Sequence, residues 1–388
     1  MSTILPGATL GVIGGGQLGR MFVHSAQRMG YFTAVLDPDA DSPAGRVSHH
    51  HIHTDYTDVD GLARLAGLAD AITTEFENVP APSLEHLAIV RPVAPGADAV
   101  AIAQDRIREK GHFVRCGVDC APYAVIETAD HLAAVQPNLL PGILKTARLG
   151  YDGKGQRRVA TQAELAAAWA DAGDVPCVLE KLLPLDFECS VIVARGGDGH
   201  TVHFPVQRNL HRDGILAVTE VHPQNMPEST ARRAVAAARS IAEGLSYVGV
   251  LCVEFFVLAD GSLVVNEMAP RPHNSGHWSM DASDVSQFEL QVRTLAGLPL
   301  NPPRQHSAAI MLNLLGDLWF IDSDVQEEPR WADVLALPGT HLHLYGKTEA
   351  RRGRKMGHLN ITGDGIEAVR STADFAAALL GLPIPLSE

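Results

Sequence analysis

The chain has 388 residues, a length that predicts two or three domains at roughly 100–200 residues per domain. Hydrophobic residues make up 46% of it, which is typical of a globular chain and excludes disorder, a collagen-like chain or a coiled coil as the dominant class. The formal net charge of −14 disfavours a broad nucleic-acid-binding surface, although a local basic pocket for a phosphorylated small molecule stays compatible with it.

The sequence carries no signal for membrane insertion or disulfide formation. No apolar stretch approaches the roughly 18 residues of a membrane-spanning helix, and the N-terminus lacks a basic segment followed by an apolar one. We therefore expect no membrane partner. The five cysteines lack the second close pair of a zinc site, and they predict reduced thiols in a cytoplasmic protein. They are Cys116, Cys120, Cys177, Cys189 and Cys252.

The first 100 residues predict a parallel α/β domain. An apolar run at 8–13 indicates a strand, a helical pattern covers 17–29, and a second strand is expected at 32–36. A further strand is expected at 71–74. Because a helix connects successive strands, the strands should lie parallel, as in Rossmann-like domains.

The remainder of the chain predicts a mixture of strands and helices. Its composition changes after Pro302-Pro303, which indicates a domain boundary near residue 300. The expected helices cover 98–116, 163–172 and 228–245, and the expected strands cover 142–146, 177–180, 249–258, 262–265, 308–314 and 341–345.

A Gly-x-Gly-x-x-Gly motif follows the first predicted strand, with Gly14, Gly16 and Gly19 just before the helix. Glycines let the backbone amides at a helix N-terminus approach an anion closely, so the motif is typical of phosphate-binding loops. Asp37 stands where a ribose-binding acid would fall. The motif by itself leaves open a site for NAD and a site for a phosphorylated substrate.

A second glycine-rich segment, GYDGKGQ, occupies 150–156. Its glycines predict a mobile hairpin that could lie over a triphosphate and donate backbone N–H groups, with Lys154 adding positive charge. It is not a P-loop, because no Lys-Ser or Lys-Thr follows, and a plain β-hairpin turn is the alternative. Lys145 precedes it on a predicted apolar strand and is expected to need an anionic partner.

Glu254 and Glu267 lie in two strand-like runs joined by a turn at 259–261. A hairpin there would place the two carboxylates side by side, with Asn266 adjacent. Like charges that close need a cation, and hard oxygen ligands beside a phosphate-binding loop favour Mg²⁺. Two solvated acids on a strand face are the alternative.

Three further polar clusters stand out. The segment RPHNSGH at 271–277 favours a pocket for a small anion over an ordinary polar loop. Lys347 and the segment RRGRK at 351–355 form a basic island, either an anion-binding loop or a solvated run of charge. The histidines within 49–53 are expected in a loop entering a strand and hold no metal, because successive strand residues point to opposite faces.

Taken together, these segments resemble the N5-carboxyaminoimidazole ribonucleotide synthetases, a family of ATP-grasp enzymes of purine biosynthesis. The resemblance runs in order over essentially the whole chain and is most specific at 266–278. It is carried by GGGQLGR at 14–20, GYDGKGQ at 150–156, EKLLPLDFE at 180–188, NLHRDGI at 209–215, NEMAPRPHNSGHW at 266–278 and GRKMGHLN at 353–360.

The resemblance implies an α/β and α+β protein with an ATP-grasp fold. A Rossmann-like parallel α/β domain would cover 1–100, an ATP-grasp domain 101–300 with lobes at about 101–180 and 181–300, and a small β-rich domain 301–388. ATP would lie between the lobes, and Glu254 and Glu267 would hold Mg²⁺. The residues implied to bind the nucleotide are Arg106, Lys145, Gly150, Tyr151, Asp152, Gly153, Lys154, Gly155, Gln156, Glu180, Lys181, Leu182, Leu183, Glu188, His211, Asn266 and Glu267.

The resemblance also implies sites for aminoimidazole ribonucleotide and bicarbonate. Arg271, His273 and Asn274 would surround bicarbonate and act with Lys154 in catalysis. The implied reaction is carboxylation of the ribonucleotide through carboxyphosphate, with release of ADP and phosphate, by an enzyme that is a homodimer. The residues implied to bind the ribonucleotide are Gly15, Gln17, Leu18, Glu75, Tyr151, Asp152, Lys347, Arg354 and Lys355.

Three other functions remain as alternatives. A formate-dependent glycinamide ribonucleotide transformylase has a similar architecture, but the cluster at 271–278 argues against it. An NAD-dependent oxidoreductase explains Gly14 to Gly19 and leaves the second glycine loop and the acidic pair without a role. A non-catalytic nucleotide-binding regulator is disfavoured because the acids that would hold a metal are intact.

Overall fold

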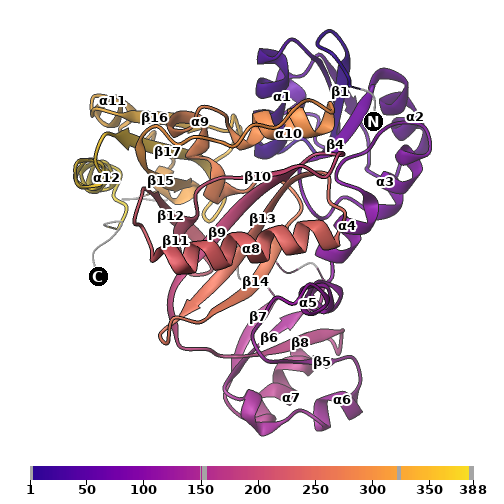
Figure 1. The fold of residues 1–388 in the computed structure, drawn as a ribbon, viewed down its shortest axis with the longest axis vertical. Helices are drawn as coiled ribbons and strands as arrows, with labels where there is room; N and C mark the ends of the chain where they lie inside the picture. Colours follow the sequence, from indigo (N-terminus) through magenta and orange to yellow (C-terminus); the bar gives the residue numbers. More distant parts are fainter. Residues whose placement is uncertain (1–2, 149, 151–154, 321–324, 384–388) are drawn as a thin grey trace.

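In the computed structural model, which describes residues 3–148, 150, 155–320 and 325–383, the strands form three sheets. One four-stranded sheet belongs to the N-terminal region and another to a small lobe, drawn at the bottom of Figure 1. A sheet of nine strands runs through the remainder and joins the parts. Within the described residues, no helix has the length and apolar character needed to cross a membrane.

The N-terminal sheet is parallel throughout, in the order β3-β2-β1-β4, as predicted. The predicted boundaries of its first strands and helix are correct to within one residue. The histidine segment differs from the prediction, because residues 50–53 form the edge strand β3, with Ile52 alone buried. The elements are β1 (Thr9–Ile13), α1 (Gln17–Arg28), β2 (Phe32–Asp37), β3 (His50–His53), α2 (Val59–Leu68), β4 (Ala71–Thr74), α3 (Ala81–Ala88) and α4 (Ala97–Ala103).

The prediction of a single helix at 98–116 is wrong, because this segment forms two helices, α4 and α5, with a short interruption between them. The first helix ends at Ala103, and Asp105 caps the second, because its carboxylate accepts hydrogen bonds from the N–H groups of Ile107 at 3.0 Å and Arg108 at 3.3 Å. This break puts Arg106 in the first turn of α5.

The small lobe is an antiparallel sheet in the order β5-β8-β6-β7. β6 pairs with β7, so the second glycine-rich segment does connect a β-hairpin. Its residues 151–154 lie outside the described part of the chain. The elements are α5 (Arg106–Arg115), β5 (Tyr123–Ile126), α6 (Ala129–Ala133), β6 (Gly142–Thr146), β7 (Gln156–Val159), α7 (Gln162–Asp171) and β8 (Cys177–Lys181).

The nine-stranded sheet has the order β14-β13-β9-β11-β12-β15-β17-β16, with β10 paired to β9. β12 pairs with β15, so the C-terminal strands continue the sheet of the preceding region. Its elements are β9 (Leu185–Arg195), β10 (Thr201–His203), β11 (Gln207–Arg212), β12 (Ile215–Val221), α8 (Glu228–Gly244), β13 (Gly249–Leu258), β14 (Leu263–Ala269), α9 (Ser279–Ala282), α10 (Gln287–Leu295), β15 (Ala308–Leu315), α11 (Trp331–Leu335), β16 (Thr340–Leu344), β17 (Lys355–Gly363) and α12 (Ile366–Leu379).

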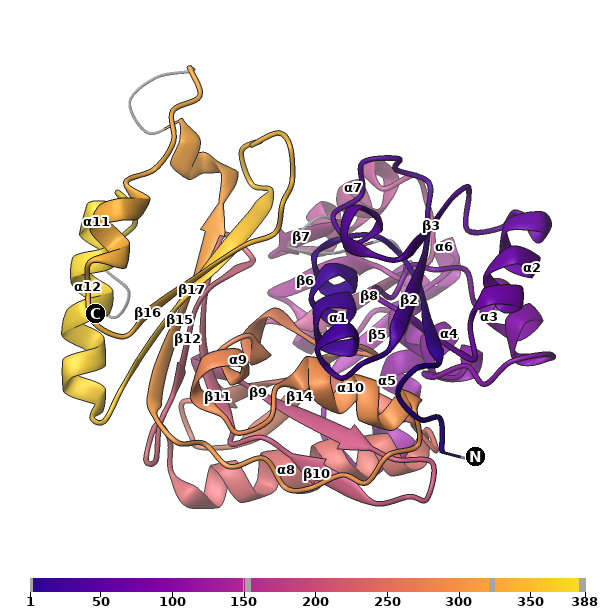
Figure 2. The same cartoon turned by 90° about the horizontal axis from the view of Figure 1, so that it is seen from above.

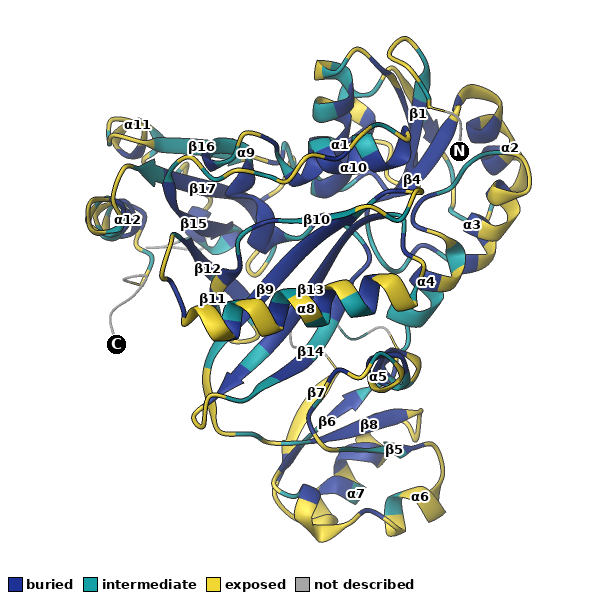
Figure 3. Cartoon of the chain, in the orientation of Figure 1, coloured by how far each residue is buried: buried dark blue, intermediate teal, exposed yellow. Residues whose placement is uncertain are grey.

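Both faces of this sheet are covered, and the side chains of β9 point alternately into the two cores. Val191 and Val193 pack in the core under α8, whereas Ile192 and Ala194 pack in the core on the other face. Figure 2 shows α8 and α12 lying along different parts of the sheet, and Figure 3 shows buried strands beneath helices with exposed outer faces. The cavity described below opens at the end of the sheet nearest the small lobe.

Helix α10 has a second role, because it also covers the N-terminal sheet. Val292 and Leu295 pack in one core with Leu10, Val12 and Phe22. Helices α1 and α10 therefore lie side by side although they are far apart in the sequence (Figure 1).

Candidate active site

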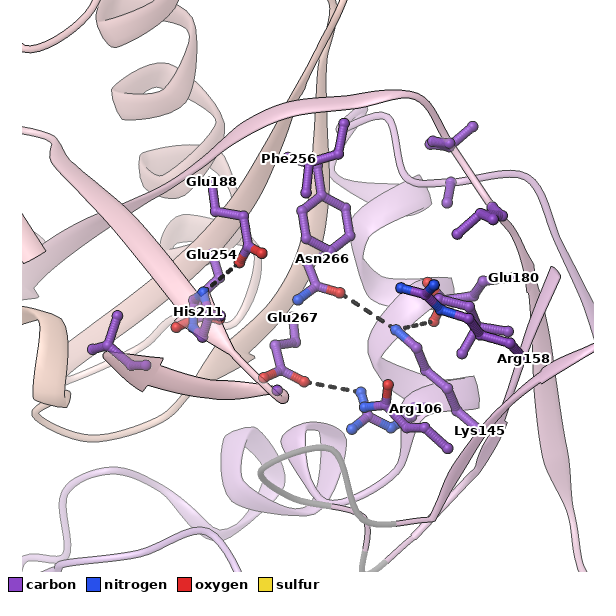
Figure 4. A pocket seen from close by; sticks show the side chains of 18 of the residues that line it. Arg106, Lys145, Arg158, Glu180, Glu188, His211, Glu254, Phe256, Asn266 and Glu267 are labelled. Atoms are coloured by element: carbon purple, nitrogen blue, oxygen red, sulfur yellow. Dashed lines mark hydrogen bonds and ion pairs between the residues drawn. The ribbon is translucent and has the colours of Figure 1, made fainter. Parts of the chain in front are cut away.

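A cavity of about 760 Å³ lies between the small lobe and the nine-stranded sheet. Figure 4 shows its charged side chains converging from α5, β6 and β8 on one side and from β9, β11, β13 and β14 on the other. The cavity brings together most of the residues predicted to bind a nucleotide: Arg106, Lys145, Gln156, Glu180, Lys181, Leu182, Leu183, Glu188, His211, Asn266 and Glu267.

The predicted acidic pair has the expected geometry. Glu254 and Glu267 stand directly opposite each other in the β13–β14 hairpin, and a bulge follows Glu254. Glu267 Oε2 accepts a hydrogen bond from Arg106 Nη1 at 2.9 Å, and the Arg106 charge holds the pKa of Glu267 below its usual range despite burial. Burial and the nearby carboxylates raise the pKa of Glu254. The charge of Glu267 is thus compensated by the Arg106 guanidinium, whereas Glu254 has no guanidinium partner. Such a pair of carboxylates suits a divalent cation that is bound by oxygen ligands.

Lys145 has the anionic partner that its apolar strand predicted. Its Nζ lies 3.2 Å from Glu180 Oε1, and Lys110 Nζ lies 3.1 Å from the same oxygen. Burial alone would raise the pKa of Glu180, but the two ammonium groups hold it below its ordinary value. Lys145 Nζ also contacts Asn266 Oδ1 at 3.5 Å, which connects this cluster to the acidic hairpin.

His211 faces the cavity as a cation. Its Nδ1 lies 2.6 Å from Glu188 Oε2, because β11 pairs with β9 and brings the two side chains together. Burial lowers the pKa of His211, but the hydrogen bond to Glu188 and the charge of Glu254 raise it to about 9. At neutral pH this side chain therefore carries a proton.

A smaller cavity of about 120 Å³ adjoins the first, and both are lined by Arg106, Glu254, Glu267, His273, Asn274 and Lys355. Arg271 lines it too and donates from Nε to Glu77 Oε2 at 2.5 Å. His273 is neutral, because burial and the charges of Arg271 and Lys355 hold its pKa well below the usual value. The predicted bicarbonate cluster is thus placed next to the acidic pair.

The first glycine loop differs from the anion-binding loop that the sequence suggested. The N–H groups of Gly16 and Gly19 donate to Glu75 at 2.6 and 2.7 Å, and the N–H of Gly15 donates to Asp37 at 2.6 Å. The chain's own carboxylates fill the position that a dinucleotide pyrophosphate would need. The loop therefore argues against the NAD alternative.

Residues predicted for the ribonucleotide meet at the seam between the first and last parts of the chain. Lys347 Nζ donates to Gln17 Oε1 at 2.7 Å, and Arg354 Nη1 donates to the backbone oxygen of Glu349. Burial and the Arg354 charge lower the pKa of Lys347 to about 8. Leu18 instead packs in an apolar cluster with Phe288 and Tyr345.

The remaining predicted residues divide into two groups. Gly150 lines the smaller cavity, and the backbone oxygen of Gly155 accepts a hydrogen bond from the Thr146 N–H in the β6–β7 turn. Tyr151, Asp152, Gly153 and Lys154 lie outside the described residues.

Sequence reasoning missed several charged residues in or beside the two cavities, among them Lys110, Arg158, Glu77 and Glu109. Lys110 follows Arg106 by one helical turn of α5, and Arg158 follows Gln156 by two residues of β7, so periodicity offered a signal for both. Glu77 and Glu109 line the smaller cavity. Glu109 lies three residues after Arg106 on α5, so helical periodicity offered a signal for it too, whereas the local sequence of Glu77 offered none.

Models of known protein families match the chain in three parts. A ribonucleotide synthetase preATP-grasp domain matches 7–104, an ATP-grasp domain matches 111–288, and a phosphoribosylaminoimidazole carboxylase C-terminal domain matches 309–372. The fold and the site therefore define an ATP-grasp ligase, and the predicted fold class is confirmed.

Individual relatives narrow the assignment. The N5-carboxyaminoimidazole ribonucleotide synthase of Brucella melitensis is 45% identical over 92% of this chain and 97% of its own length, and that of Bacillus subtilis is 41% identical over 92% of each. A solved ADP complex of an N5-carboxyaminoimidazole ribonucleotide synthetase superposes with a TM-score of 0.89 at 39% identity, covering 97% of this chain and 98% of the other. The Aspergillus clavatus synthase in complex with ADP and 5-aminoimidazole ribonucleotide gives 0.86 at 29% identity, covering 96% and 98%.

The chain belongs to the N5-carboxyaminoimidazole ribonucleotide synthase family. It is an enzyme of purine biosynthesis that uses ATP to carboxylate aminoimidazole ribonucleotide, and the predicted enzyme class and reaction are confirmed.

Proposed function

We propose that the two adjoining cavities form one active site, in which bicarbonate is phosphorylated by ATP and its carbon is passed to the amine of aminoimidazole ribonucleotide. The observation that carries the proposal is the set of side chains shared by the two cavities. Arg106, Glu254 and Glu267 line both, so a phosphate group and a small anion could meet there.

The larger cavity would hold the nucleotide. Residues 180–183 offer a hinge for the base, and Glu188 together with the protonated His211 would bind the ribose side. Arg106 and Lys145 would contact the phosphates, because both bring positive charge to the cavity from the small lobe. The segment 150–156 would close over them as a lid that excludes water, with Lys154 adding charge.

Mg²⁺ would be held by Glu254 and Glu267, with Asn266 adjacent. The donor set fits this ion, since it offers hard oxygen atoms and Glu254 lacks a full counter-charge. A bound Mg²⁺ would offset negative charge on the transferring phosphoryl group.

The smaller cavity would hold bicarbonate among Arg271, His273 and Asn274. Arg271 is fixed by Glu77, and His273 is held through Ser275, so both are oriented before an anion arrives. A bicarbonate oxygen would displace ADP from the γ-phosphorus and give carboxyphosphate. The exocyclic amine would then take the carbon, phosphate would leave, and the amine would lose a proton.

The ribonucleotide would approach from the seam between the first and last domains. Gly15, Gln17 and Glu75 would flank it on one side, joined by Tyr151 and Asp152 of the lid, while Leu18 would support the loop from its apolar cluster. Lys347, Arg354 and Lys355 would bind its 5′-phosphate, since they concentrate positive charge beside Gln17. In this proposal the predicted domain 101–300 binds ATP, and the predicted domains 1–100 and 301–388 bind the ribonucleotide.

We also propose a cytoplasmic homodimer. The five cysteines are all free thiols in the structure, which supports a reducing compartment. The resemblance to the family supports the dimer.

The decisive experiment measures ADP release with Mg·ATP and aminoimidazole ribonucleotide, with bicarbonate either added or rigorously depleted. Bicarbonate-dependent ADP release with carboxylated product in proportion is expected. Turnover that ignores bicarbonate would contradict the proposal, and formate would then be tested as the acid.

A further inference from the structure

Cys252, Glu254 and His273 bring three different metal-ligating groups together. Among the described residues they form the group in which a sulfur, a carboxylate oxygen and an imidazole nitrogen all lie within 4.8 Å of one another. His273 Nε2 and Glu254 Oε1 are already 3.2 Å apart.

The backbone explains the grouping. Residues 252 and 254 of β13 are two apart and therefore point to the same face of the sheet. His273 reaches that face from the loop that follows β14. Glu254 and His273 line both cavities, whereas Cys252 is fully buried behind them, so a cation arriving from the cavity would meet the oxygen and nitrogen first.

A neighbouring hydroxyl supports two of the three groups. Ser275 Oγ lies 2.9 Å from His273 Nδ1 and 3.9 Å from Cys252 Sγ. The backbone N–H of Ser275 also donates to His273 Nδ1 at 3.3 Å, so Nδ1 is an acceptor and the ring proton lies on Nε2, which faces Glu254 Oε1 at 3.2 Å. This proton leaves when Nε2 binds a metal ion. Such outer hydrogen bonds orient the ligands of metal sites.

We propose that Cys252, Glu254 and His273 form a Zn²⁺ site within the active centre. A thiolate, an imidazole and a carboxylate are the ligands that Zn²⁺ takes in proteins, at about 2.0–2.3 Å, and three protein ligands leave a fourth position open to water or an anion. Mg²⁺ does not use sulfur and keeps to oxygen, so the cysteine selects the softer ion. As the Zn–S bond forms, the thiol proton passes to solvent.

The site makes the enzyme sensitive to zinc. Zn²⁺ would take Glu254 away from Mg²⁺ and His273 away from bicarbonate, so occupancy and turnover exclude each other. This consequence rests on the proposed function, whereas metal binding itself does not.

Binding is tested without turnover by titrating the full-length, metal-free protein with Co²⁺ as a spectroscopic probe. The unmodified protein should take up one equivalent with a thiolate-to-cobalt charge-transfer band, and Zn²⁺ should displace it. The band should vanish in Cys252→Ala and in Cys252→Ser, which keeps the shape of the side chain. Cys116→Ala is the matched control, because Cys116 Sγ lies 3.3 Å from His112 Nε2 and is the other cysteine–histidine contact in the described chain.

Inhibition is tested by following ADP release in excess Mg·ATP with rising Zn²⁺. The concentration for half inhibition should rise at least about tenfold in Cys252→Ala and stay unchanged in Cys116→Ala. The proposal is overturned if the unmodified protein shows no thiolate band, or if Cys252→Ala matches it in zinc sensitivity. An enzyme inactive even without zinc would count against the proposed function, and the cobalt band would still decide the site.

Discussion

In the larger cavity the cations face carboxylates at close range: Lys110 and Lys145 share Glu180, and Arg106 pairs with Glu267. At the seam beside Gln17 the balance is different, because Lys347 and Arg354 gather in one short stretch and the pKa of Lys347 falls to about 8. A ligand that arrives with its own metal ion needs a balanced site, whereas a bare phosphate needs surplus positive charge. The two regions fit the two halves of the proposed reaction in this way.

Removing the carboxylate of Glu180, which Lys110 and Lys145 share, should disturb the charge balance of the larger cavity most severely. In Glu180→Gln two nearly buried ammonium groups would lose the carboxylate that both contact, which should cost about 3–5 kcal/mol of unfolding free energy. Urea denaturation measures the loss. The double variant Glu180→Gln/Lys110→Met should recover part of it, and equal stability of all three proteins would contradict the electrostatic account.

The next largest effect is expected in the β13–β14 hairpin, which carries the acidic pair. Glu267→Gln should reduce ADP formation about 100- to 1,000-fold, because a neutral amide is a poor Mg²⁺ ligand and leaves Arg106 without its partner. Steady-state ADP release checks this, with Glu228→Gln on the exposed face of α8 as the control. Near-normal turnover of Glu267→Gln would refute the metal assignment.

Substitution at the seam should affect substrate affinity more than turnover. Lys355→Ala should raise the KM for aminoimidazole ribonucleotide about 10- to 100-fold, the usual effect of losing one charged contact. Arg351→Ala is the matched control, because Arg351 pairs only with the exposed Glu349 among the described ion pairs. An unchanged KM in Lys355→Ala would remove that residue from the phosphate site.

The seam should also respond to pH. Lys347 is protonated below its pKa of about 8 and neutral above it, so kcat/KM for the ribonucleotide should fall about tenfold between pH 7 and pH 9. The Lys347→Arg variant keeps its charge through this range and should flatten the profile. The assignment is contradicted by a flat profile in the unmodified enzyme, or by an inflection near pH 8 that survives in Lys347→Arg.

The sequence predicted elements well where periodicity was strong. The strand at 71–74 and the strand at 142–146 have the observed bounds, and Glu254 faces Glu267 as the hairpin argument required. The helix at 98–116 failed because a single side chain, Asp105, interrupts an otherwise helical pattern by capping the next turn. Helical periodicity does not reveal such a local competition for backbone N–H groups.

The site was harder to predict where partners come from distant segments. The amides of Gly16 and Gly19 bind Glu75, a residue more than fifty positions away, so the motif alone could not show that its anion is internal. Glu109 accepts the N–H of Met268 at 2.7 Å across a still larger separation. Such contacts depend on tertiary packing, which a single sequence pattern does not encode.

The packing of α10 on the N-terminal sheet has a consequence for biosynthesis. Leu10, Val12 and Phe22 leave the ribosome long before Val292 and Leu295 are made. Until then the nascent chain carries an uncovered apolar surface, and such surfaces attract chaperones or other unfinished chains. The first domain reaches its final packing only after α10 has been translated, when at least about three-quarters of the chain has been made.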